Sequence, residues 1–154
     1  EDLKFIEAVA ETGMKVIISC GGTSVEDLQA AFTILDKKKT ILLQCTSEYP
    51  TPTERVNLRA MNFLEQKFKL NVGLSSHHTS PSLAAMAAAY GAKVIEVHVT
   101  LSRAMWGTDQ AMSLEPRGMQ KLCNTVRMFE TALGNAEKEL YEGEILTLAR
   151  TIEK

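Results

Sequence analysis

The sequence contains no long apolar run and no dense cluster of positive charge. No apolar stretch reaches about 18 residues, the length of a membrane-spanning helix, so we expect no membrane partner. The 17 basic and 19 acidic side chains give a net charge of −2, and the densest basic run is Lys37-Lys38-Lys39. Because nonspecific binding to phosphate backbones needs clustered lysine and arginine, we expect no nucleic-acid partner either.

Cysteine is also scarce. The three cysteines, Cys20, Cys45 and Cys123, are odd in number and lack the Cys-x-x-Cys spacing of many zinc sites. Two of them lie in or beside apolar, strand-like segments. We therefore expect reduced thiols in the core of a cytoplasmic protein, rather than disulfides or zinc ligands.

Four short segments are rich in Val, Ile and Leu and lead toward helical patterns: residues 14–19, 40–45, 71–75 and 92–99. This alternation predicts an α/β fold with about four parallel strands. The largely apolar composition of the segments is typical of strands that helices cover.

Helix signals separate these strands. Thr23-Ser24-Val25-Glu26 has the pattern of a capping box, and Ser80-Pro81 supplies an N-cap followed by proline. Gly91 is expected to end the alanine-rich helix after Pro81. The last predicted helix ends at Gly134 and carries an apolar stripe formed by Met119, Leu122, Val126, Phe129 and Leu133. The residues beyond it are charged and weakly patterned.

Two histidines stand at the ends of the third and fourth predicted strands, where parallel α/β proteins bind ligands. Side chains alternate along a strand, so His77 shares a face with Ser75, and His98 shares one with Glu96. If the strands are neighbours, the two imidazoles converge and suit a divalent metal, with Glu96 as a supporting partner. The alternative is a pair of hydrogen-bonded structural histidines. His78, on the other face, is expected at the surface or in a supporting role.

A long segment, residues 101–115, follows the fourth predicted strand. A simple connection needs only a few residues, so this length favours a functional loop. The alternative is a packed lid with Trp106 as its plug. The loop after the second predicted strand contains Tyr49-Pro50-Thr51-Pro52. This motif does not distinguish a functional loop from a structural one, because paired prolines stiffen any loop.

Several separated motifs together resemble the sialic acid synthase family. In order along the chain they are Cys45-Thr46-Ser47-Glu48-Tyr49-Pro50-Thr51-Pro52, Val56-Asn57-Leu58, Gly73-Leu74-Ser75-Ser76-His77, Gly91-Ala92-Lys93-Val94-Ile95-Glu96-Val97-His98-Val99-Thr100-Leu101, Trp106-Gly107-Thr108-Asp109-Gln110 and Ser113-Leu114-Glu115-Pro116. The segment from Arg103 to Gln110 resembles the branch that acts on bacterial sialic-acid-like sugars and spore-coat polysaccharide precursors.

The resemblance implies a fold and a reaction. Family members condense phosphoenolpyruvate with an N-acetylhexosamine such as N-acetylmannosamine, or its 6-phosphate, to a nine-carbon 2-keto sugar acid and release phosphate. Their catalytic domain is a TIM barrel, of which residues 1–138 resemble the C-terminal half. Residues 139–154 would then lead toward a missing C-terminal domain, and the full-length protein would form a homodimer. The first four strands, with the family's catalytic Glu, are expected to precede this sequence, so the chain alone is expected to be inactive.

The resemblance also implies roles for individual residues. His77 and His98 correspond to the metal ligands, for Mn²⁺ or Mg²⁺. The positions that contact phosphoenolpyruvate correspond to Ser19, Ser47 and Ser75, and those that contact the amino sugar to Tyr49 and Asp109. The alternative is a noncatalytic half-barrel that binds a sugar or acts in assembly, because four parallel strands leave two open edges.

Overall fold

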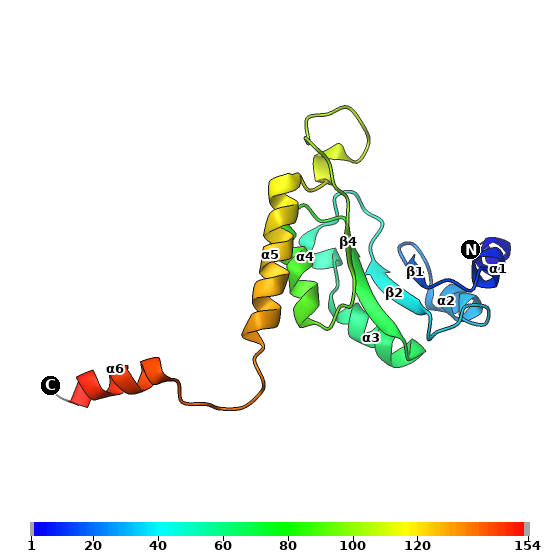
Figure 1. The fold of residues 1–154 in the computed structure, drawn as a ribbon. Helices are drawn as coiled ribbons and strands as arrows, with labels where there is room; N and C mark the ends of the chain where they lie inside the picture. The colour runs from blue at the N-terminus through cyan, green and yellow to red at the C-terminus, as the bar shows by residue number, and fades with distance from the viewer. Residues whose placement is uncertain (1, 153–154) are drawn as a thin grey trace.

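Residues 2–152 fold into a parallel sheet of four strands, joined by helices (Figure 1). The computed structural model describes residues 2–152, and the side chains of residues 2–149. The strands pair in the order of the sequence: β1 (Val16–Ser19), β2 (Thr40–Cys45), β3 (Asn71–Ser76) and β4 (Ile95–Val97). The α-helices are α1 (Leu3–Glu11), α2 (Val25–Ala31), α3 (Arg59–Phe68), α4 (Pro81–Ala89), α5 (Pro116–Ala132) and α6 (Glu142–Ile152). Two short 3₁₀ helices, η1 (Thr53–Arg55) and η2 (Gln110–Met112), lie in loops.

The main core lies between the sheet and the helices that connect its strands. Val72 and Leu74 are 1% exposed and belong to the same cluster as Met61, Leu64 and Phe68 of α3. Val72 and Leu74 therefore lie on the face of β3 that packs against the helices. A second, smaller cluster joins α4 to α5, which run side by side in Figure 1.

The fourth strand is shorter than predicted. It covers residues 95–97 instead of 92–99, because the chain changes partners after Val97. Val99 forms a bridge with Leu114, and the Leu114 N–H donates to the His98 carbonyl at 2.8 Å. The far end of the 101–115 segment therefore pairs with the residues that follow β4, which places that segment beside the strand end.

The helix boundaries follow the expected signals, with one correction. Ser80 caps α4 by accepting from the Leu83 N–H, and α4 ends before Gly91, whose φ is 89°. The capping box of α2, however, joins Ser24 to Asp27 rather than Thr23 to Glu26. The Ser24 hydroxyl accepts from the Asp27 N–H at 3.1 Å, and the Asp27 carboxylate accepts from the Ser24 N–H at 3.2 Å.

This capping box predicts a pH-dependent contribution to stability. Hydrogen bonds from Ser24 hold the pKa of Asp27 below its ordinary value. A carboxylate with a lowered folded-state pKa stabilises the fold above its unfolded pKa, and the contribution disappears as pH falls through the folded pKa. We expect Asp27→Asn to lower the melting temperature at pH 7, and the deficit to shrink below about pH 4.

Glu26→Gln, in the same helical turn, is the matched control, because the box does not use its carboxylate. A deficit of Asp27→Asn that stays constant down to about pH 2.5 would show that the charge of Asp27 does not contribute.

The C-terminal part of the chain lies apart from the sheet. Residues 133–141 run out from the end of α5, and α6 does not pack on the rest of the described chain in Figure 1. All described side chains from residue 131 to residue 149 are exposed. Within residues 2–152, no helix combines the length and the apolar character required to span a lipid bilayer.

Candidate functional site

Two histidines meet at the carboxyl ends of β3 and β4. The register pairs Ser75 with Glu96 and Ser76 with Val97, so His77 and His98 follow on adjacent strands. Their ring centroids lie 5.1 Å apart, and the ring planes meet at 81°. The predicted convergence of the two rings is therefore observed. Their role as metal ligands stays a prediction.

His77 is held in one orientation. Its side chain is buried, and its Nδ1–H donates to the Thr46 carbonyl at 2.9 Å. Because a carbonyl oxygen only accepts, this contact places the proton on Nδ1, so the neutral ring has its free lone pair on Nε2. The ring of Tyr49 covers His77, with the two centroids 4.1 Å apart.

His98 is more accessible. Its Nδ1 lies 3.6 Å from Oδ2 of Asp109, and the two side chains are 35% and 50% exposed. That distance is longer than a hydrogen bond but short enough for electrostatic attraction to a protonated ring. Tyr49 approaches His98 edge-on, with a centroid distance of 6.0 Å. Both predicted sugar-binding residues, Tyr49 and Asp109, thus lie against the histidine pair.

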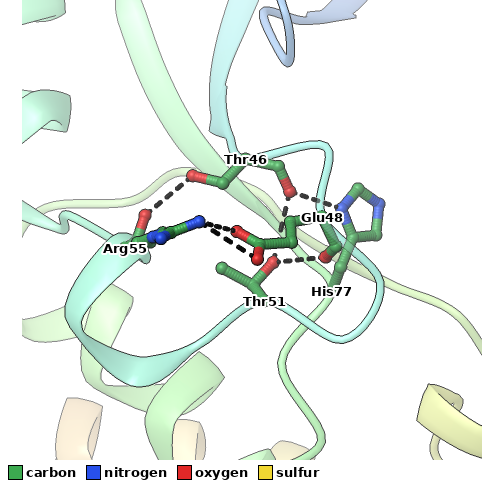
Figure 2. A network of polar contacts seen from close by, with 5 residues as sticks. All are labelled: Thr46, Glu48, Thr51, Arg55 and His77. Atoms are coloured by element: carbon green, nitrogen blue, oxygen red, sulfur yellow. Dashed lines mark hydrogen bonds and ion pairs between the residues drawn. The ribbon is translucent and has the colours of Figure 1, made fainter.

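The loop after β2 closes on His77 (Figure 2). The N–H of Thr51 donates to the His77 carbonyl at 3.1 Å, and its hydroxyl lies 2.8 Å from the Glu48 carbonyl and 3.2 Å from the Thr46 carbonyl. Arg55 donates to both carboxylate oxygens of Glu48 at 3.1 and 3.0 Å. Sequence reasoning missed this network, although the Tyr-Pro-Thr-Pro motif marked its position.

The three predicted phosphoenolpyruvate-binding serines occupy different settings. Ser75 is buried, and its hydroxyl donates to Oε1 of Glu96 at 2.7 Å. Glu96, predicted to support a histidine, therefore bonds to Ser75. Ser19 and Ser47 are exposed at the ends of β1 and β2. A Cβ on Gly21 would overlap the Ser47 hydroxyl oxygen, so this glycine lets the loop after β1 lie against Ser47.

His78 takes no part in the pair. Its Nδ1 accepts from the Ser80 N–H at 3.0 Å, and its Nε2 lies 3.1 Å from the Thr53 hydroxyl. Both nitrogens are therefore engaged outside the pair, by Ser80 at the start of α4 and by Thr53 of η1.

The segment 101–115 is not a lid plugged by Trp106. Trp106 is 99% exposed, so that alternative is wrong. Polar contacts hold the base of the loop: Arg103 Nε donates to the Ser113 carbonyl at 2.8 Å, and the Thr100 hydroxyl bonds to the Gln110 side chain. Met112 and Leu114 of the same segment are buried, and the Asp109 carbonyl accepts from the Ser113 hydroxyl at 2.7 Å, so both packing and polar contacts fix the position of Asp109.

The three cysteines are unpaired. Cys20 is buried as expected, and burial raises the pKa of its thiol. Cys45 and Cys123 are only half-buried, and the sulfur of Cys45 lies 4.0 Å from Nδ1 of His77. The thiol thus lies on the side of the His77 ring that faces away from the free lone pair.

The imidazoles of His77 and His98 fit a divalent cation that takes its remaining ligands from other groups. A ring centroid lies about 3.3 Å from a cation bound at one of its nitrogens, so two rings bound at about 90–110° have centroids about 5 Å apart. The observed spacing of 5.1 Å agrees with that. Within the described residues, no group of three or more His, Cys, Asp or Glu side chains is placed to hold a metal. A cation here would therefore bind the two imidazoles and complete its shell with water, substrate or other groups.

Comparisons with known proteins give a consistent picture. The model of the NeuB family matches residues 1–138. N,N'-diacetyllegionaminic acid synthase of Campylobacter jejuni is 36% identical over 148 residues, which cover 93% of this chain and 44% of that protein. Human N-acetylneuraminate-9-phosphate synthase is 35% identical over 144 residues, which cover 92% of this chain and 40% of that protein. The chain thus spans less than half the length of these relatives.

Solved structures show the same fold. The crystal structure of an N-acetylneuraminic acid synthetase from Leptospira borgpetersenii matches with a TM-score of 0.82 and 31% identity, over 97% of this chain and 53% of that one. A spore coat polysaccharide biosynthesis protein from Bacillus subtilis matches with a TM-score of 0.81 and 26% identity, over 92% of this chain and 41% of that one. The four strands and their helices form half of a TIM barrel, as predicted, and the chain belongs to the NeuB family.

Proposed function

We propose that this chain supplies the second half of a metal-dependent synthase that condenses phosphoenolpyruvate with an N-acetylhexosamine. The product would be a nine-carbon 2-keto sugar acid such as sialic acid, and phosphate would be released. The observation that carries this proposal is the pair of histidine rings 5.1 Å apart at the carboxyl ends of β3 and β4, beside Tyr49 and Asp109. In TIM-barrel enzymes this end of the strands holds the active site.

The histidines would hold Mn²⁺ or Mg²⁺. His77 fits this role because its Nδ1–H is bound to Thr46 and its Nε2 is free to bind a cation. When bound, the cation would act as a Lewis acid and polarise the aldehyde of the open-chain sugar. Thr46 and Tyr49 keep the His77 ring in place for that role, as partners behind metal-binding histidines generally do.

Asp109 and Tyr49 would position the acceptor sugar. The Asp109 carboxylate is half exposed and can accept hydrogen bonds from sugar hydroxyls, while the exposed part of the Tyr49 ring offers an apolar face. Their contribution would come from orienting the aldehyde against phosphoenolpyruvate.

The serines would contact phosphoenolpyruvate. In the structure the Ser75 hydroxyl proton points to Glu96, so donation to an anionic ligand requires that hydroxyl to turn away from Glu96. Ser47 and Ser19 are exposed and have no such constraint. Binding of the anion would then begin at the ends of β1 and β2.

A noncatalytic module is the second candidate. The observation that favours it is that, among residues 2–152, β1 and β4 each have a single neighbour in the sheet, and open edges favour association. A chain with this fold would then bind a sugar or pair with another half-barrel without performing chemistry.

Reconstitution separates the two candidates. We would join this chain to the N-terminal half of a NeuB-family synthase and assay phosphate release from phosphoenolpyruvate with a panel of N-acetylhexosamines. Release that needs both Mn²⁺ or Mg²⁺ and one acceptor supports the synthase. A folded fusion that binds an N-acetylhexosamine but releases no phosphate supports the module.

We further propose that the full-length protein is a cytoplasmic homodimer.

A further inference from the structure

The loop after β2 contains a buried threonine. Thr51 is 4% exposed, although it lies between two prolines in a surface loop. Burying a hydroxyl is unfavourable unless it is hydrogen-bonded, and this hydroxyl faces the carbonyls of Glu48 at 2.8 Å and Thr46 at 3.2 Å.

Thr51 contacts His77 in two ways, as Figure 2 shows. Its backbone N–H donates to the His77 carbonyl at 3.1 Å, which ties the loop to the end of β3. Its hydroxyl lies against the Thr46 carbonyl, and that same oxygen accepts the Nδ1–H of His77 at 2.9 Å. One threonine therefore bonds to the backbone of His77 and contacts the group that fixes the His77 ring.

The Thr46 carbonyl also accepts the Glu48 N–H at 2.9 Å, so that N–H and the imidazole already use its two lone pairs. The single proton of the Thr51 hydroxyl has its shorter contact with the Glu48 carbonyl, so the hydroxyl closes the turn from Thr46 to Glu48 and also contacts the Thr46 oxygen. Without the hydroxyl, the turn from Thr46 to Glu48 keeps the Glu48 N–H contact but loses the bond to the Glu48 carbonyl, so the Thr46 carbonyl is held less firmly as the acceptor of the His77 Nδ1–H. The ring would then exchange between its two tautomers, and a proton would occupy Nε2 for part of the time.

We propose that Thr51 is a positioning residue that holds His77 in its Nδ1–H tautomer and so keeps the Nε2 lone pair free. This proposal rests on the proposed function only where it concerns metal affinity. Its structural part concerns the metal-free chain.

The decisive comparison is Thr51→Val against Thr51→Ser in the 154-residue chain. Valine keeps the branched shape and the backbone N–H but removes the hydroxyl, whereas serine keeps the hydroxyl. Thr53→Val is the matched control, because the Thr53 hydroxyl contacts His78 and not His77.

The first readout is the tautomer of His77, from long-range ¹H–¹⁵N correlation spectra without metal. Spectra are recorded at about pH 8.5, where an ordinary imidazole is neutral. His78→Ala and His98→Ala assign the signals. We expect a single Nδ1–H tautomer in the parent, in Thr51→Ser and in Thr53→Val, and a mixture of tautomers in Thr51→Val. A single Nδ1–H tautomer in Thr51→Val would overturn the proposal, and so would a mixture in the parent.

The second readout is Mn²⁺ affinity by calorimetry. We expect Thr51→Val to bind about 10- to 100-fold more weakly, the usual effect of removing a partner behind a metal-binding histidine, and Thr51→Ser to match the parent. Equal weakening in both variants would contradict the role of the hydroxyl. A parent that does not bind Mn²⁺ would refute the metal site of the proposed function, while the tautomer spectra would still decide the role of Thr51.

A folding defect does not block the test. If Thr51→Val does not fold, Thr51→Cys replaces it, because a thiol is a weak donor of small volume. A mixture of tautomers in Thr51→Cys would support the proposal, and a single Nδ1–H tautomer would refute it.

Discussion

His98→Ala should abolish phosphate release by the reconstituted synthase. The chain brings two imidazoles together, and removal of one takes away half of the donor set that it offers to a cation. A bound cation that polarises a carbonyl contributes several kcal/mol, so we expect phosphate release to fall about a thousandfold or more. Initial rates measured at saturating Mn²⁺ give the comparison.

His78→Ala is the matched control for this prediction. The two histidines that follow β3 are adjacent in sequence, but the nitrogens of His78 bond to Ser80 and face Thr53. We expect this variant to keep phosphate release within about tenfold of the parent. Similar losses in His78→Ala and His98→Ala would mean that the loss reflects a general disturbance of the strand ends.

Gly73→Ala should destabilise the fold strongly, although it adds only one methyl group. Gly73 lies in β3, where a Cβ would overlap the Val94 carbonyl oxygen and lie 2.5 Å from Cδ2 of Leu43. The same carbonyl accepts the Leu74 N–H at 2.9 Å, so it cannot move away without weakening the contact between β3 and the chain entering β4. We expect a loss of about 2–4 kcal/mol, at or above the upper end of the usual cost of overpacking.

Gly118→Ala makes the same substitution, but we do not expect it to destabilise the fold. Gly118 lies within α5, and its added Cβ would meet Leu114 at 3.5 Å, an ordinary contact. Alanine favours a helix over glycine by roughly 0.5–1 kcal/mol, so this variant should be at least as stable as the parent. Urea unfolding of both variants tests the pair, and a neutral Gly73→Ala would show that β3 and β4 separate at little cost.

The main features of the site could be predicted because they depend on periodicity. Alternation along a strand placed His77 with Ser75 and His98 with Glu96, and the parallel order of the strands then brought the two rings together. The apolar residues on the other face, Val72 among them, were predictable for the same reason.

Other features depend on contacts that leave no periodic signal. The fourth strand ends early because Val99 pairs with Leu114, a partner that alternation does not reveal. The side chains of Thr51 and His77 bond to backbone carbonyls, which every residue possesses, so no residue type in the sequence predicts these bonds. Trp106 is 99% exposed although tryptophan is usually well buried, and nothing in its residue type predicts this exposure.

The central claim is that His77 and His98 bind one divalent cation, and a Mn²⁺ thermal-shift measurement on the 154-residue chain tests it most directly. A ligand that binds only the folded state at 100 times its Kd stabilises by about 2.7 kcal/mol, so the melting temperature of the parent should rise with Mn²⁺. We predict that His98→Ala and His77→Ala lose this rise, while His78→Ala retains most of it. No rise in the parent, or an equal loss in His78→Ala and His98→Ala, would contradict the claim.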